Sequence, residues 1–213
     1  EIRVEGRPVH FSGPVDAQRA GIAMIHQELD LVPGLSVAEN LFLGREPRTR
    51  FGTVDRRAME RRTRELLRRT GTELRPWHPV GELRVGEQQL VTIAKALSLN
   101  AKVLIMDEPT SALAAAEVTQ LFAVIRELRS AGTGIIYISH RMDEISEIAD
   151  RATVLRNGSV VGEFDPSSMT TAEVVEAMVG QPAQSVFRTE RTTAGEELLR
   201  VMDLAVRPRR QQS

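Results

Sequence analysis

Two adjacent carboxylates at the end of an apolar run are the sharpest chemical feature of the sequence. Residues 103–106 are all apolar, and Asp107 and Glu108 follow them directly. A strand that ends in this way places both carboxylates at the carboxyl edge of a sheet, where open α/β sheets bind ligands. Asp107 there suits a Mg2+ ion held through water, and Glu108 suits a base that polarises a water attacking a γ-phosphate. A strand that ends in solvated acids is the alternative for this motif taken alone.

A glutamine and a histidine follow two other apolar runs. Gln27 follows residues 21–25, and its neutral amide can contact a metal ion or a water and release it easily. His140 follows residues 135–138, and an imidazole there can hydrogen-bond a phosphate. A surface amide and a structural histidine are the alternatives for these residues taken singly. The other histidines have no such context and receive no role; they are His10, His26 and His78.

The order of elements that must position these residues predicts an α/β sheet with a mostly helical insertion over residues 36–99. The apolar runs 103–106 and 135–138 are typical of strands that are buried on both faces. The other expected strands are a hairpin over 2–11, a strand over 21–25 and a hairpin turning at 157–158. The expected helices are 37–42 and 171–179, each after a capping box, 56–70 with Asp55 as N-cap, 90–97, 118–128 and 142–148.

The composition limits the classes of protein that the sequence fits. Its 213 residues are 41% hydrophobic and 27% charged with a net charge of −1, which excludes a disordered tail and a generic polyanion binder. The absence of cysteine excludes a disulfide scaffold and a thiolate metal site. No run approaches the ~20 apolar residues that cross a bilayer. We therefore expect a soluble, cytosolic protein of one domain, or of one domain and a fragment.

Four ordered segments together resemble the motifs of the ATP-binding cassette (ABC). Residues 25–29 resemble the Q-loop, residues 80–90 the signature, residues 103–113 Walker B with its D-loop, and residues 137–141 the H-loop. The resemblance is specific because the order and spacing of the motifs also match. The stretch 29–47, LDLVPGLSVAENLFLGREP, is similar to the first nucleotide-binding domain of the tandem subunits that power bacterial carbohydrate importers of the ribose, galactose and xylose type.

The resemblance implies a P-loop-NTPase-like cassette of the α/β class. Its mostly parallel, incomplete core sheet would be formed by residues 1–35 and 100–180, and residues 36–99 would form a helical subdomain that carries the signature. Residues 181–196 are polar and irregular, like a linker. Residues 197–213 look like the opening strand of a second cassette. Both ends of the chain thus suggest a piece of a longer subunit.

The family's roles carry over to the matching positions. Glu108 and His140 would be catalytic, and Gln27 and Asp107 would contact Mg2+. Gly86 would let the backbone approach a phosphate, toward which the helix beginning near Glu87 points its positive end. In the family, that phosphate belongs to ATP held by the opposite cassette. The residues expected to bind ATP are Gln27, Leu83, Arg84, Val85, Gly86, Glu87, Gln88 and Ser111.

The sequence departs from the family pattern at two places. Arg84 stands where the signature usually has a small serine; an arginine can meet a phosphate bidentately, but it adds bulk and weakens the expected contact across the dimer. A P-loop ends in Gly-Lys-Ser/Thr, yet neither Lys95 nor Lys102, the only lysines, follows a glycine. In the family, that loop precedes the strand that matches residues 1–4. We therefore expect the 213-residue chain alone to be inactive.

A cluster of ten arginines between Arg45 and Arg69 raises the question of nucleic-acid binding. Nucleic-acid surfaces interleave basic residues with aromatic ones for stacking, and this stretch offers only Phe51. Met59, Thr63, Leu66 and Leu67 give the expected helix one less polar side. A solvated helix with its guanidinium groups outward is therefore the preferred interpretation, and no nucleic-acid partner is expected.

The resemblance implies an ATP-hydrolysing subunit that powers sugar import, with ATP and Mg2+ as its ligands. Its expected partners are membrane-spanning permease subunits, a second cassette in tandem or as a dimer, and indirectly a periplasmic or extracellular sugar-binding protein. The expected location is peripheral, on the cytoplasmic side of the plasma membrane. Two alternatives stay open: a non-hydrolysing cassette remnant that docks on partners, and a soluble ABC ATPase associated with DNA or ribosomes.

Overall fold

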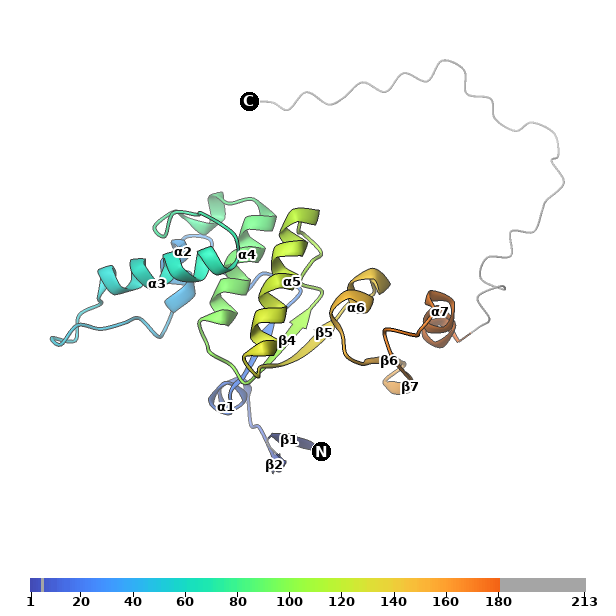
Figure 1. The fold of residues 1–213 in the computed structure, drawn as a ribbon. Helices are drawn as coiled ribbons and strands as arrows, with labels where there is room; N and C mark the ends of the chain where they lie inside the picture. The colour runs from blue at the N-terminus through green and yellow to red at the C-terminus, as the bar shows by residue number, and fades with distance from the viewer. Residues whose placement is uncertain (5, 181–213) are drawn as a thin grey trace, which may run out of the picture. The chain divides into compact units, whose positions relative to one another are not determined.

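The computed structural model describes residues 1–4 and 6–180, in which strands and helices alternate as expected (Figure 1). The strands are β1 (Ile2–Val4), β2 (Arg7–Val9), β3 (Ile22–Ile25), β4 (Val103–Asp107), β5 (Gly134–Ile138), β6 (Ala152–Arg156) and β7 (Ser159–Phe164). The helices are α1 (Pro14–Arg19), α2 (Val37–Phe42), α3 (Arg56–Arg69), the short 3-10 helix η1 (Val80–Glu82), α4 (Val85–Leu97), α5 (Ala115–Ser130), α6 (Met142–Ile148) and α7 (Thr171–Val179). The expected linker over 181–196 and the expected strand over 197–213 lie outside the described residues.

The described residues form two compact units. The first contains residues 1–152 and 165–168, apart from residue 5, and the second contains residues 153–164 and, as far as the description reaches, 169–180. In the second unit, β6 and β7 form the hairpin that the sequence predicts. Its turn residues Asn157 and Gly158 have φ angles of 52° and 78°, as a type I′ turn requires. Arg156 Nη1 donates to the Ala177 carbonyl at 3.0 Å and ties this hairpin to α7.

A three-stranded parallel sheet in the order β3-β4-β5 is the centre of the first unit. Ile25, Met106 and Tyr137 lie side by side across the three strands. Because the strands are parallel, their carboxyl ends meet at one edge of the sheet. β1 and β2 form a separate antiparallel hairpin, as expected for residues 2–11.

Only one face of this sheet is covered by the described residues. Ala23, Leu104 and Met106 are at most 3% exposed and pack in one cluster with residues of α4 and α5. On the opposite face, Ile136 and Ile138 are 52% and 45% exposed. For the described chain, the expectation of burial on both faces is therefore wrong for residues 135–138, whereas Val103 and Ile105 of β4 are partly buried. An apolar run shows that a strand can be buried on both faces, but it does not show which elements cover it.

Helix α4 lies between the sheet and a second, helical core. Its residues Leu90, Ile93 and Leu97 belong to the sheet-side cluster, as their spacing predicts. Val91 and Ala94 are fully buried on its other side, in a cluster with residues of α2, α3 and η1. Both faces of α4 are thus apolar and buried, which joins the two cores through one rigid element.

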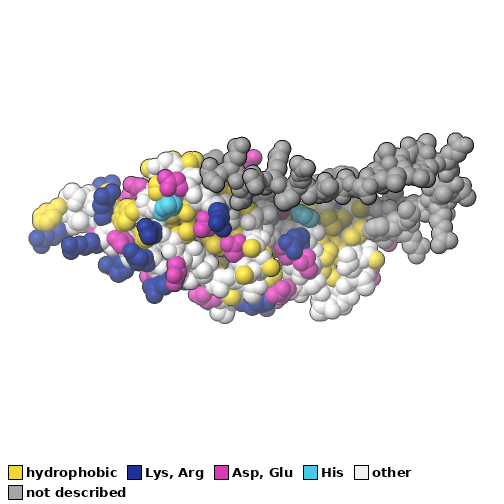
Figure 2. Space-filling view, turned by 90° about the horizontal axis from the view of Figure 1, so that it is seen from above, with side chains coloured by type: hydrophobic (Ala, Val, Ile, Leu, Met, Phe, Trp, Pro, Cys, Tyr) yellow, Lys and Arg dark blue, Asp and Glu magenta, His cyan; other side chains and the backbone are white. Residues whose placement is uncertain are grey.

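The arginine-rich helix α3 has the outward-facing cations that the sequence predicts. Asp55 caps it by accepting from the Ala58 N–H at 2.9 Å, and the buried side of the helix includes Met59 and Leu67. Figure 2 shows Arg side chains gathered over α3 and its preceding loop. The arginines of α3 with exposed side chains are Arg56, Arg57, Arg61, Arg62, Arg64 and Arg68.

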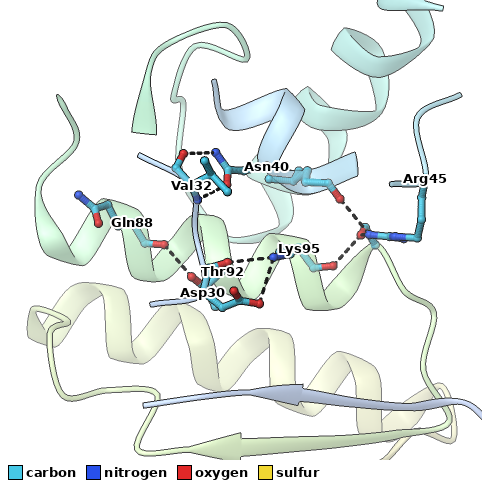
Figure 3. A network of polar contacts seen from close by, with 9 residues as sticks. Asp30, Val32, Asn40, Arg45, Gln88, Thr92 and Lys95 are labelled. Atoms are coloured by element: carbon cyan, nitrogen blue, oxygen red, sulfur yellow. Dashed lines mark hydrogen bonds and ion pairs between the residues drawn. The ribbon is translucent and has the colours of Figure 1, made fainter. Parts of the chain in front are cut away.

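A buried asparagine and a lysine join the segment after β3 to the helical core (Figure 3). Asn40, which is 1% exposed, accepts from the Val32 N–H at 2.8 Å and donates to the Val32 carbonyl at 3.1 Å. Lys95 of α4 donates to the Asp30 carbonyl at 2.9 Å and lies 3.4 Å from its carboxylate. The segment that carries Gln27 is therefore connected to both α2 and α4.

Among the described residues, no helix combines the length and the apolar character that crossing a membrane requires.

Replacing the buried Asn40 by Ala should destabilise the first unit, whereas an exchange at an exposed position should not. The change leaves the Val32 N–H and carbonyl without these partners, and a buried unpaired polar group costs about 1–3 kcal/mol. We expect Asn40→Ala to lower the free energy of unfolding by about 2–4 kcal/mol in urea denaturation. Gln18→Ala, at an exposed position of α1, is the control and should change it by less than about 0.5 kcal/mol. Equal values for the two variants would contradict this role of Asn40.

Candidate functional site at the carboxyl edge of the sheet

The carboxylate of Glu108 lies between the Gln27 amide and the His140 imidazole. Gln27 Nε2 donates to Glu108 Oε2 at 3.3 Å, and His140 Nδ1 lies 3.0 Å from Glu108 Oε1. These residues are 81 and 32 positions away from Glu108 along the chain. The structure thus brings together three of the residues that the sequence singles out, each from a different strand end.

The register of the sheet explains this meeting. Ile25 and Met106 are paired across β3 and β4, and Gln27 and Glu108 each come two residues after this pair. His140 comes two residues after the last residue of β5, Ile138. Side chains that follow paired positions of parallel strands emerge at the same edge of the sheet. The three side chains can therefore meet without a long loop.

The backbone of Glu108 is held in an uncommon conformation. Its φ angle is 44°, in the left-handed region that residues other than glycine rarely adopt. Its N–H donates to the Ile138 carbonyl at 3.0 Å, which extends the contact between β4 and β5 by one residue. Such strain costs on the order of 1–3 kcal/mol and is concentrated at functional sites.

The protonation of the pair follows from the chemistry of a carboxylate. An ionised Glu108 can only accept hydrogen bonds, so His140 Nδ1 carries the proton of their 3.0 Å contact, and Nε2 remains for another partner. The His140 side chain is 69% exposed, whereas that of Glu108 is 29% exposed. A ligand can therefore reach the imidazole from solvent, with the carboxylate behind it.

Asp107 and Gln27 line an open cavity of about 480 Å3 beside this pair. The cavity is also lined by His26, Glu28, Leu29 and Asp30. Within residues 1–4 and 6–180, no group of three His, Cys, Asp or Glu side chains forms a complete metal site. The oxygen donors of Asp107 and Gln27 fit Mg2+, which prefers one or two protein oxygens and takes its other ligands from phosphate and water.

The signature segment forms the start of α4. The helix begins at Val85, two residues before the expected start near Glu87. The Arg84 N–H donates to the Glu87 carboxylate at 2.8 Å, and Gln88 Nε2 donates to the Leu83 carbonyl at 2.9 Å. Glu87 and Gln88 thus satisfy backbone groups at the helix start. Leu83 is buried, whereas Arg84 and Val85 are exposed.

Gly86 lies against the loop that follows Glu108. A Cβ at this position would be 3.1 Å from the Ala112 carbonyl oxygen and 3.3 Å from the Glu117 carboxylate. Close packing within the chain is therefore a second reason for glycine here, beside the expected approach of a phosphate. Ser111 lies in the same loop, where its N–H donates to the Glu108 carbonyl at 3.2 Å. Among the described residues, no hydrogen bond joins residues 83–88 to Gln27, Glu108 or His140.

One buried residue beside the site has no signal in the sequence. Glu144 of α6 is 2% exposed, and its carboxylate contacts side chains from both loops of the site. Its hydrogen bond with Tyr137 adds to the effect of burial, which is the main cause of the raised pKa of that phenol. A glutamate in the first turn of a short helix is ordinarily solvated, so burial of this one could not be inferred from its type or position.

Comparison with known proteins agrees with this geometry. The family model described as ABC transporter matches residues 1–111. Among solved structures, a dimeric ATP-binding cassette in a post-hydrolysis state with ADP and Pi has a TM-score of 0.66 and 22% sequence identity. The similarity covers 78% of this chain and 73% of that one. At this identity, the likeness establishes the fold alone, which is that of an ATP-binding cassette.

Curated relatives are closer in sequence and longer. Ribose import ATP-binding protein RbsA 1 of Rubrobacter xylanophilus is 50% identical over 207 residues, which are 97% of this chain and 41% of that protein. A Burkholderia ambifaria protein, whose name describes a ribose/galactose/methyl galactoside import ATP-binding protein, is 53% identical over 95% of this chain and 39% of its own length. The chain thus spans about two fifths of the length of these relatives. The matched segment, the parallel sheet and the residues at its carboxyl edge lead to one conclusion: the chain belongs to the ABC transporter family.

Proposed function

We propose that this chain is part of an ATP-binding subunit that hydrolyses MgATP to power the import of a sugar. The observation that carries the proposal is the Glu108 carboxylate at the carboxyl edge of the sheet, between Gln27 and His140. An acid, an amide and an imidazole at one strand edge can activate a water, contact a metal-bound phosphate and hydrogen-bond the transferred phosphoryl group.

Glu108 acts as the general base in this proposal. A water attacks the γ-phosphorus in line with the β–γ bridge, the bond from that phosphorus to the bridging oxygen breaks, and Glu108 accepts the proton of the water. In the structure, both carboxylate oxygens are engaged, one by Gln27 and one by His140. Each carboxylate oxygen can accept a second hydrogen bond, so Glu108 can take the water while both of these contacts persist.

His140 and Gln27 are suited to the triphosphate because of their placement. The exposed His140 ring can turn its Nε2 toward a γ-phosphate while its Nδ1–H stays on Glu108. In the imidazolium form, in which both ring nitrogens carry protons, Nε2–H can donate to a phosphate oxygen. Gln27 and Asp107 would hold Mg2+, which supplies neutralisation of the phosphate charge when bound. Ser111 and residues 83–88 at the start of α4, of which Arg84 and Val85 are exposed, would face ATP of a second cassette.

The proposed partners and location follow from the curated relatives, whose names describe sugar import. We infer membrane-spanning permease subunits as direct partners, a second cassette in tandem or as a dimer, and a sugar-binding protein as an indirect partner. The subunit would then lie at the cytoplasmic side of the plasma membrane. The ATPase core would comprise residues 1–35 and 100–180, and residues 36–99 would be the helical subdomain, with its 36–75 part near the permease. The Asp30–Lys95 contact supports a connection between this subdomain and Gln27.

A docking role without hydrolysis is the second candidate. Arg84 in the signature and the absence of a Gly-Lys pair from the chain favour it. The paired Glu108 and His140 oppose it, because a docking module does not need a base and an imidazole in contact. The full-length subunit, rather than the 213-residue chain, distinguishes the two, since a phosphate-binding loop is essential for turnover.

Replacing Glu108 by Gln in the full-length subunit should abolish turnover and preserve binding. The amide keeps the size of the side chain but cannot accept a proton, and loss of a general base costs roughly 100- to 10,000-fold in kcat. We expect phosphate release to fall by at least about 100-fold while ATP affinity, measured by equilibrium binding, changes by less than about threefold.

Glu127→Gln is the matched control, because Glu127 lies on α5 in an exposed ion pair with Arg69. It should retain the unmutated rate. Unchanged turnover in Glu108→Gln would remove Glu108 from the role of base. A full-length subunit that binds its partners without any turnover would support the docking role instead.

Replacing Arg84 by Ser in the full-length subunit should increase turnover. Arg84 is exposed and its side chain adds bulk beside the helix start, whereas a hydroxyl can donate a compact hydrogen bond to phosphate. One such bond is worth about 1.4 kcal/mol, so we expect Arg84→Ser to raise kcat about tenfold in the full-length subunit. Arg19→Ser, at an exposed position of α1, should leave it unchanged. A fall in kcat for Arg84→Ser would show instead that Arg84 itself binds the phosphate.

A further inference from the structure

Glu144 is a buried carboxylate whose two oxygens are both fully engaged. Thr110 Oγ1 donates to Oε1 at 2.7 Å, and Arg141 Nε lies 3.1 Å from the same oxygen. Tyr137 and Ser139 both donate their hydroxyls to Oε2 at 2.9 Å. Burial of a carboxylate is unfavourable unless hydrogen bonds and a counter-charge compensate it, and here both are present.

The groups on this carboxylate lie close in sequence to both Glu108 and His140. Thr110 comes two residues after Glu108, in the loop that leaves β4. Ser139 and Arg141 are the residues immediately before and after His140, in the loop that leaves β5. One side chain therefore links the two loops whose relative position sets the Glu108–His140 contact.

The direction of these hydrogen bonds restricts the loops further. A carboxylate accepts and does not donate, so the hydroxyl protons of Thr110, Tyr137 and Ser139 must all point to Glu144. Ser139 Oγ is then free to accept from the Arg141 N–H, which it does at 3.0 Å. The loop that carries His140 is consequently held at the residues on each side of the imidazole.

We propose that Glu144 is a positioning residue for ATP hydrolysis, which fixes the loop of Glu108 relative to the loop of His140. Its carboxylate does not touch the reacting atoms; it acts through Thr110 and Ser139. The inference rests on the proposed function, because it assigns Glu144 a role in the same site. A displacement of about 1 Å between catalytic groups costs up to ~100-fold in rate, so a clamp of this kind can affect turnover without contacting the nucleotide.

The test uses the full-length subunit and separates kcat from KM. In Glu144→Ala, the loops lose their common partner, and we expect kcat to fall about 10- to 100-fold while KM for ATP stays within about threefold. In Glu144→Gln, the amide oxygen can still accept from the hydroxyls. We therefore expect the decrease in log kcat for Glu144→Gln to be at most about two thirds of the decrease for Glu144→Ala. Melting temperatures of all variants establish that the measured fractions are folded.

Glu147 provides the matched control on the same helix. It lies in α6, three residues after Glu144, and forms an exposed ion pair with Arg126 at 2.7 Å. Exposed pairs contribute little, so Glu147→Gln should retain the unmutated kcat and KM. If Glu144→Ala does not fold, Thr110→Val and Ser139→Ala decide the question, because each removes one hydrogen bond to the carboxylate.

A coupling measurement distinguishes positioning from general stability. If Glu144 acts through Thr110, adding Thr110→Val to folded Glu144→Ala should lower kcat by less than about twofold further, although Thr110→Val alone lowers it more. Unchanged kcat in folded Glu144→Ala, or in both single-bond variants, would overturn the proposal. A loss of kcat with a matching rise in KM would overturn it as well. Failure of the proposed function has a different signature: no MgATP turnover by the unmutated subunit, or full turnover in Glu108→Gln.

Discussion

The contact of one carboxylate with an amide and an imidazole depends on three parallel strands ending side by side. Glu108 can lie between Gln27 and His140 only while β4 stays in register between β3 and β5. The apolar cluster under the sheet fixes that register, because a slip of one residue would turn Met106 away from α4 and α5. Stability and chemistry are thus linked through the same strand.

Helix α4 extends this constraint to the helical core. One of its faces packs under the sheet and the other against α2 and α3, so the two cores cannot shift independently without disturbing it. Its start carries the signature residues, and Lys95 near its end contacts Asp30 in the segment after Gln27. The structure therefore contains a continuous connection from the carboxyl edge of the sheet to the helical layer, made of packed side chains and the two contacts of Lys95 with Asp30.

The periodicity of apolar residues and the capping and turn residues predicted most helices and strands, because these signals act within a few residues. Ser36 with Glu39, Asp55, and the Asn157–Gly158 turn each satisfy backbone groups within a few residues, so their sequence is sufficient evidence. The meeting of strand ends was predictable because parallel strands share an edge. What could not be predicted is which faces of the sheet are covered, since the exposure of Ile136 depends on whether distant segments pack on its face. The buried contacts of Asn40 and Glu144 are equally non-local.

The start of α4 shows why an unusual residue in a motif need not disturb the fold. The Arg84 N–H is bound by the Glu87 carboxylate, so the helix start is satisfied from within the helix and does not require a serine side chain at position 84. The constraint on Gly86 comes from the Ala112 carbonyl, which is likewise independent of residue 84. An exposed arginine is therefore compatible with the local structure. Its effect falls on the molecule that binds at the start of α4. That separation makes residue 84 a position where binding can be altered while the cassette keeps its shape.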